Sequence, residues 1–234
     1  MKSIFKMLAV TIIVIFCMMS CLIILKQFNI NGGWITKLIP FAAMILVALF
    51  FLKVVDKKNI ADIGLIFPKG TILPCIVLTI IALIPVMIGA LNDGKVCMSK
   101  NIDMSLTVLI GYYFIVGFAE EFFVRGYIYH GITISKLKVV LSSAIFAMFH
   151  IISSEINAFL LITLFIAGVI FALSYKFLNS LWPLIIFHTI WDIGAAYTDY
   201  YQNIILCMIM YLLMLLTSYV IYKFSARGQK VIDA

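Results

Sequence analysis

The sequence predicts an all-α protein, a polytopic membrane bundle of about eight transmembrane helices with both termini in the cytoplasm. Composition is the first reason, because 65% of the 234 residues are hydrophobic and only 12% are charged, whereas soluble domains carry about 25% charged residues. The second reason is that apolar runs recur along the whole chain, close in length to the roughly 20 residues that cross a bilayer. The third is an alternation of basic residues between successive loops.

Eight apolar runs are the predicted helices, and polar or turn-forming residues separate them. The fifth and seventh runs are short, which indicates tilting, helix ends beyond the apolar run or partial burial among neighbours. The longest connections, around 53–70 and 123–137, leave no room for a soluble domain. The predicted helices cover residues 4–25, 34–52, 71–91, 104–122, 138–152, 158–178, 182–198 and 203–222.

The first three predicted spans contain almost no buried polar chemistry, so we expect them to serve as scaffold. The first of them follows Lys2 and Lys6 and has the outline of a signal peptide. Its apolar stretch is long and lacks a small-x-small exit, which favours an uncleaved helix. Asn92-Asp93-Gly94 is a turn signal that ends the third span.

Basic residues orient the predicted helices. The N-terminus, the second, fourth and sixth loops and the C-terminus carry 13 of the 17 lysines and arginines. By the positive-inside rule, we expect both termini in the cytoplasm. The net charge of +7 follows from this topology, so we expect the basic loops to contact membrane lipid and no nucleic acid.

The polar chemistry of the chain gathers between residues 120 and 192, at three places in apolar sequence. Ionisable side chains at membrane depth are costly unless they are paired or face a wet cavity, so each place is a candidate functional site.

The first of these three places is at the end of the fourth predicted span. On a helix, Glu121 and Arg125 lie four residues apart with the acid first, the favourable order for a pair. Glu120 points about 100° away from Glu121, so one acid is neutralised while the other stays available; a charged helix end is the structural alternative.

The second place is His150. It lies about twelve residues, or roughly 18 Å, along the fifth helix from Lys138, and this distance puts it in the middle of the membrane. At the third place, His188 and Asp192 lie four apart on one face of the seventh helix. A histidine bonded to a neighbouring helix and a structural His-Asp pair are the alternatives. The predicted topology brings these side chains and Glu120 to a similar depth, where they form the minimum set for activating a water. His130, the remaining histidine, lies in a predicted loop with an expected surface role.

Together the three places resemble the CPBP family of intramembrane proteases, which includes the eukaryotic CAAX prenyl-protein endopeptidase and bacterial members once called Abi. The family pattern is E-E-x-x-x-R, then F-x-x-x-H, then H-x-x-x-N or D. All three elements occur here in order: Glu120-Glu121 with Arg125, Phe146 with His150, and His188 with Asp192. The resemblance implies a single integral-membrane domain with scaffold spans in 1–103, a catalytic core in 104–198, and the last span and cytoplasmic tail in 199–234.

The resemblance also implies roles for these residues. Glu120 would be the general base that, with His150, holds and deprotonates a water, and it would then return a proton to the leaving amine. His188 and Asp192 would stabilise the oxyanion. The CAAX endopeptidase has asparagine at the last position, whereas an ionised aspartate only accepts hydrogen bonds. Asp192 must therefore be protonated by its site, orient His188 or ligate a metal. The remaining motif residues, Glu121, Arg125 and Phe146, would support the site.

We expect no required cofactor. A divalent metal such as zinc is the alternative, because two histidines with carboxylates suit such an ion, and its ligands would come from the set Glu120, His150, His188 and Asp192. The spacing is not the compact H-E-x-x-H of soluble zinc proteases. The cysteines are odd in number and form no C-x-x-C pair, so we interpret them as apolar filler: Cys17, Cys21, Cys75, Cys97 and Cys207.

The main hypothesis is an endopeptidase that cuts a membrane-associated peptide or protein, and relatives suggest peptide maturation or bacteriocin self-immunity as its role. The Ile-, Lys- and Phe-rich composition indicates a bacterial plasma membrane. One alternative is a noncatalytic immunity or regulatory protein that binds a partner through its spans. Another is a proton-coupled transporter, since buried Glu, His and Asp also form proton relays. The fully occupied motifs and the lack of a visible repeat favour the hydrolase, while substrate, cleavage position and oligomeric state stay open.

Overall fold

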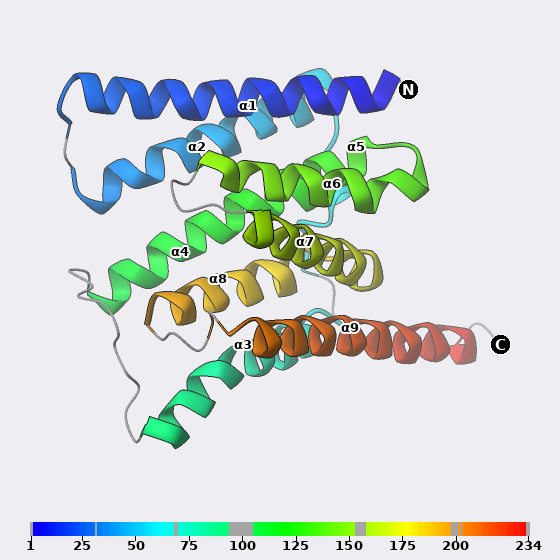
Figure 1. Cartoon of the computed structure of the whole chain (residues 1–234). Coiled ribbons are helices and arrows are strands. Elements are labelled where there is room, and N and C mark those ends of the chain that lie inside the picture. The colour runs from blue at the N-terminus through cyan, green and yellow to red at the C-terminus, as the bar shows by residue number, and fades with distance from the viewer. Residues whose placement is uncertain are drawn as a thin grey trace. The chain divides into compact units, whose positions relative to one another are not determined.

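The computed structural model is helical throughout the part of the chain that it describes (Figure 1), and no strand occurs there, as predicted. The chain divides into two compact units. The first comprises Met1–Leu65 with Phe118–Ala172, and the second comprises Ile66–Gly117 with Leu173–Ala234. Each unit is described by itself. The described residues are 2–30, 32–67, 70–93, 105–152, 158–197, 201 and 203–232.

Every predicted apolar run corresponds to a helix, with ends within a few residues of the prediction except at the fourth and eighth runs. By length and composition, six helical stretches of the described chain can cross a membrane. The runs that the sequence marks as short are α6 and α8, with 15 and 16 residues. The long helices are α1 (Lys2–Gln27), α2 (Trp34–Phe50), α3 (Ile72–Asp93), α4 (Leu106–Glu121), α6 (Ser135–Phe149), α7 (Ala158–Leu178), α8 (Trp182–Tyr197) and α9 (Ile204–Ile232). The short ones are η1 (Phe51–Val55), η2 (Ile60–Ile63), η3 (Phe122–Ile128), α5 (Tyr129–Gly131) and η4 (His150–Ile152).

The fourth helix continues well past its predicted end. α4 passes into the π-helix η3 and then into α5, so the helical stretch ends only at Gly131. In η3 the amide N–H bonds a carbonyl five residues back, as Tyr129 does to Val124. The predicted loop from residue 123 was wrong, because the charges that signalled a helix end are satisfied inside the protein. His130 accordingly lies in a helix and is half-buried, with Nδ1 3.1 Å from the Gly126 carbonyl oxygen.

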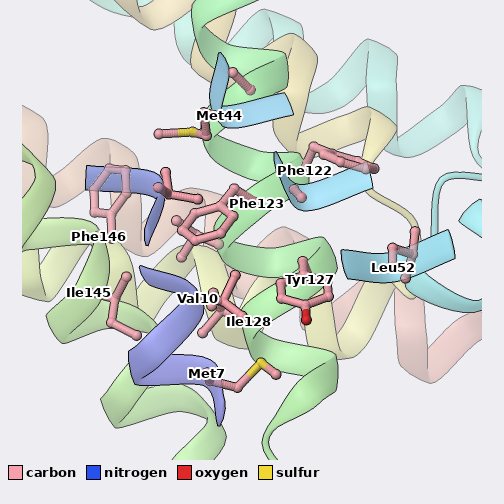
Figure 2. Packing of buried hydrophobic residues seen from close by; sticks show 14 of the residues in the cluster. Met7, Val10, Met44, Leu52, Phe122, Phe123, Tyr127, Ile128, Ile145 and Phe146 are labelled. Carbon is pink, nitrogen blue, oxygen red and sulfur yellow. The ribbon is translucent and has the colours of Figure 1, made fainter. Parts of the chain in front are cut away.

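The apolar core of the first unit forms around η3, where two phenylalanines stand next to the motif glutamates (Figure 2). Phe122 stacks on Phe118 with ring centroids 5.6 Å apart, and Phe123 meets Phe149 edge to face at 5.5 Å. Residues of α1 and α2 complete this core. The two expected scaffold helices therefore pack directly on the segment that carries Arg125. Core residues that Figure 2 labels include Met7, Val10, Met44, Leu52, Phe122, Phe123, Tyr127, Ile128, Ile145 and Phe146.

A polar network also ties α1 and the end of η1 to η3. The Asp56 carboxylate accepts a hydrogen bond from the Tyr127 hydroxyl at 3.0 Å and forms an ion pair with Lys6. Near it, the hydroxyl oxygens of Ser3 and Thr133 lie 2.9 Å apart. Because the charged side chains of Lys6 and Asp56 are 34% and 20% exposed, this ion pair costs less desolvation than a fully buried pair would.

In the second unit, α3 packs against both α8 and α9. An aromatic cluster forms where α8 ends, with the Trp191 ring 4.8 Å from the rings of both Tyr201 and Tyr211. The Tyr201 hydroxyl donates to the Ala82 carbonyl oxygen at 2.5 Å. These contacts hold the end of α8 in place, one turn or less from Asp192.

α6 and α7 approach closely at a pair of small residues in the first unit. A Cβ atom built on Gly168 would lie 3.0 Å from both Cα and Cβ of Ser143 and 3.2 Å from its carbonyl oxygen. Small residues permit such close approach between membrane helices. The contact brings the α7 backbone within reach of side chains on α6 and η3.

We predict that Gly168→Ala destabilises the protein by about 1 to 3 kcal/mol through overpacking, because the new methyl group meets backbone atoms. Gly111→Ala is the matched control, since Gly111 also lies inside a helix but has no atom within 4 Å of its Cβ position. Both changes gain up to about 1 kcal/mol of helix propensity. The measurement is the thermal midpoint of monodisperse protein in detergent, and a midpoint for Gly168→Ala at or above that of Gly111→Ala contradicts the prediction.

Candidate active site

The buried Glu121–Arg125 pair is the electrostatic centre of the candidate site. Arg125 Nη1 lies 2.9 Å from Glu121 Oε1, and both side chains have an exposed fraction of 0%. This confirms the predicted pairing of these two residues. A buried charge without a partner is strongly destabilising, so each residue depends on the other.

Two aromatic rings enclose the guanidinium group of Arg125. Its Cζ lies 4.3 Å from the ring centroid of Phe146 on α6 and 5.0 Å from that of Phe171 on α7, both within cation–π range. Arg125 Nη2 also donates to the Gly168 carbonyl oxygen at 3.4 Å. The planar guanidinium can stack and donate at the same time, which a lysine ammonium cannot do.

Phe146 connects this pair to the second motif. Its ring centroid lies 4.9 Å from that of His150, and its carbonyl oxygen lies 3.0 Å from His150 Nδ1. A carbonyl oxygen only accepts, so Nδ1 carries the proton of this hydrogen bond. In the neutral ring, Nε2 then holds the lone pair and can accept a hydrogen bond or a proton.

The two adjacent glutamates have different surroundings, in agreement with the sequence prediction. Glu121 is fully buried against Arg125, whereas Glu120 is only partly buried. Helical periodicity turns their side chains about 100° apart. Glu120 and His150 lie in the same unit. Glu120 lies where α4 passes into η3, and His150 lies where α6 gives way to η4.

The third motif lies on α8 in the second unit. His188 Nε2 is 3.7 Å from Asp192 Oδ2, which is ion-pair range and longer than a hydrogen bond. Their side chains are 9% and 25% exposed. The predicted pairing on one helix face is confirmed. Tyr113 on α4 and Tyr211 on α9 lie close enough to Asp192 to interact with it electrostatically.

Gly117 explains how α4 approaches α8 next to His188. A Cβ atom at Gly117 would lie 3.1 Å from Thr189 Oγ1 and 3.5 Å from His188 Cβ. The sequence analysis missed this glycine, as it missed Gly168 and Phe171. Each is a small or aromatic residue within an apolar run, and only small residues spaced along a membrane helix give any signal of such contacts.

The structure thus assembles the first two motifs through the contacts Glu121–Arg125–Phe146–His150, and it places the third motif within the other unit. Among the residues that it describes, no group of three or more His, Cys, Asp and Glu side chains is arranged to hold a metal ion. The chemistry proposed below uses the side chains of the motifs themselves.

Buried ionisable groups inside a multi-pass helical protein, together with an oriented histidine, are the features of an intramembrane enzyme. The sequence model of the family described as Rce1-like, type II CAAX prenyl endopeptidase, matches residues 102–194. That stretch contains all three motifs. The match confirms the resemblance to the CPBP proteases over this stretch of the chain. No curated protein matches the chain.

We predict that removing one member of the buried pair destabilises the protein more than removing both. Glu121→Leu and Arg125→Met each leave an uncompensated buried charge, which costs about 3 to 5 kcal/mol, whereas apolar replacement of a whole buried pair is often neutral. The measurement is a double-mutant cycle of unfolding in detergent, with Glu121→Leu/Arg125→Met as the double variant. Additive losses would show that the two residues act independently and would contradict the prediction.

Proposed function

We propose that the chain is an intramembrane endopeptidase that hydrolyses a peptide bond in a membrane-associated peptide or protein, using water activated by Glu120 and His150. The observation that carries the proposal is the fixed ring of His150, whose Nδ1 is engaged by the Phe146 carbonyl oxygen. The match of residues 102–194 to a family of endopeptidases supports the reaction class.

In the proposed reaction, a water lies between the Glu120 carboxylate and His150 Nε2. Nε2 accepts a hydrogen bond from the water and orients it, while Glu120 removes its other proton. The hydroxide adds to the peptide carbonyl carbon and forms a tetrahedral oxyanion. Glu120 then gives its proton to the leaving nitrogen as the C–N bond breaks, so the carboxylate is regenerated.

We assign His188 as the donor to the oxyanion and Asp192 as the group that positions its ring. An ionised Asp192 can only accept hydrogen bonds, so it cannot itself donate to the oxyanion. With Nε2 facing Asp192 at 3.7 Å, His188 donates through Nδ1 when its ring carries both protons. Ionised Asp192 balances that charge. The positioning role, but not the charge balance, is open to asparagine as well, because the amide oxygen also accepts.

The biological role that we propose is maturation of a peptide or self-immunity to bacteriocins, in a bacterial plasma membrane and with both termini in the cytoplasm. In this proposal both roles are carried out by cleavage. The basic loops and the multi-pass topology support the orientation, and the family match supports a peptide or protein substrate.

We predict that Glu120→Gln and His150→Ala each lower the cleavage rate by about 10²-fold or more, the usual contribution of general acid–base catalysis, with the helical content unchanged. The measurement is cleavage of a library of membrane-anchored, quenched fluorescent peptides by purified protein in liposomes. Asp62→Asn, which changes an exposed carboxylate in η2, is the control. If both site variants keep full activity in the host while the protein stays folded, the chain acts as a noncatalytic partner and the proposal fails.

Asp192 offers a separate test of its positioning role. We predict that Asp192→Asn keeps activity within about tenfold of the parent, because an acceptor remains, while Asp192→Ala loses about 10²-fold, comparable with the loss of an oxyanion donor. The same liposome assay measures both variants, with the split between kcat and KM. An equal loss in the two variants would show that the negative charge itself is required.

A further inference from the structure

A small pocket lies in the second unit, at the ends of three apolar helices. Its cavity volume is about 130 Å³, and it is lined at the start of α3, the end of α7, the start of α8 and the C-terminal part of α9. α3 begins a candidate membrane span at Ile72, and the candidate spans of α7 and α9 end at Leu178 and Ser225. The pocket therefore lies at the level where a span gives way to the bilayer surface, which is where lipid headgroups lie.

Thr71 lines this pocket with a hydroxyl that the helix does not use. Thr71 is 2% exposed, and within the described part of the chain its Oγ1 has no hydrogen-bond partner. Its carbonyl oxygen accepts from the Cys75 N–H at 3.1 Å, so Thr71 is the N-cap of α3. An N-cap hydroxyl normally accepts from the second or third N–H of the helix. Here the third residue is Pro74, which has no N–H.

Two helix N-termini border the same pocket. α3 starts at Ile72 and α8 starts at Trp182, and the first N–H groups of a helix have no carbonyl partner within it. Here Pro74 and Pro183 lack an N–H, and the Leu184 N–H donates to the Leu181 carbonyl oxygen, so the first two N–H groups of α3 and the first of α8 are the relevant ones. They also carry the positive end of the helix dipole, which favours anions. A hydrogen bond links the segments that precede the two helices: the Ser180 hydroxyl, before α8, donates to the carbonyl oxygen of Ile66, before α3, at 3.2 Å. The walls also include apolar residues, among them Phe177 and Ile221, and the hydroxyl-bearing residues Tyr222 and Ser225.

Basic residues stand next to the lining. Lys176 precedes Phe177 on α7, and Lys223 follows Tyr222 on α9; both lysines are exposed. Lys223 Nζ lies 5.4 Å from the ring centroid of Tyr219, which is not part of this pocket's lining, so Lys223 adds positive charge at the helix surface and not inside the pocket. Lysines close to the membrane surface attract anionic lipid. The helix N-termini and the lysines thus favour a negatively charged group, Thr71 offers it a hydrogen-bond donor, and the apolar residues of the lining suit hydrocarbon beside it.

We propose that this pocket binds a phosphate group, with Thr71 donating a hydrogen bond to a phosphate oxygen. A phospholipid headgroup supplies such a group at this depth, with its acyl chains along the apolar helices, and free phosphate is the other source. The pocket is separate from the motif residues and does not depend on the proposed peptidase activity.

The test is native mass spectrometry of the purified, delipidated full-length chain in detergent, titrated with dioleoyl phosphatidylglycerol. Dioleoylglycerol has the same acyl chains without the phosphate. We expect the phospholipid to bind at least about tenfold more tightly, and Thr71→Val to remove most of that preference, because a hydrogen bond to a charged oxygen is lost. Thr71→Ser keeps the hydroxyl and should keep the preference.

Thr163→Val is the matched control, because Thr163 lies on α7 away from the pocket and its hydroxyl donates to the Phe159 carbonyl oxygen. Circular dichroism and gel filtration check that each variant folds. Competition by millimolar inorganic phosphate would identify free phosphate as the ligand, and no competition would identify the lipid. Equal binding of the phospholipid to Thr71→Val and to the parent, or equal binding of dioleoylglycerol and the phospholipid to the parent, overturns the proposal.

Discussion

Burial of a full positive charge among apolar helices is the constraint on which the first unit depends. Arg125 has no exposed surface, and Glu121, also fully buried, balances it at 2.9 Å. Two aromatic rings and one backbone carbonyl also contact its guanidinium group, and Glu120 interacts with it electrostatically. Because these groups come from α4, η3, α6 and α7, one charge fixes four segments of the chain relative to one another. The close approach of α6 and α7 at Gly168 follows from the same requirement.

Phe146 joins this electrostatic centre to the proposed chemistry. Its ring lies against Arg125, and its ring and carbonyl oxygen both contact His150. The orientation of the histidine is thereby coupled to the position of the ion pair. A membrane enzyme gains from such coupling, because a reactive side chain must hold its geometry without a rigid soluble domain around it.

The sequence was sufficient for the fold class, the positions of the apolar helices and the pairing of Glu121 with Arg125, since each depends on periodicity that local sequence carries. It was not sufficient for η3. Charged residues are ordinary signals of a helix end, and nothing in the sequence reveals that a contact on another helix will satisfy them. The contacts of Gly168 and Phe171 escaped for the same reason, because they depend on which helices meet. Physical argument alone did not assign catalytic roles to the residues of the three motifs, and the resemblance to a known family was needed for that.

The π-helix also imposes a counting rule on the chain. Each hydrogen bond in η3 joins residues five apart, whereas each bond in an α-helix joins residues four apart. The π-helix therefore contains one more residue than an α-helix would need to cover the same stretch. Deleting one residue between 122 and 128 would leave hydropathy and span length almost unchanged. A deletion from a regular α-helix would turn every following side chain by about 100°, whereas a deletion here can remove the extra residue of the π-helix and leave the later residues on the same face. Substitution and deletion in this segment therefore differ in kind: the first changes a contact, and the second changes the type of helix.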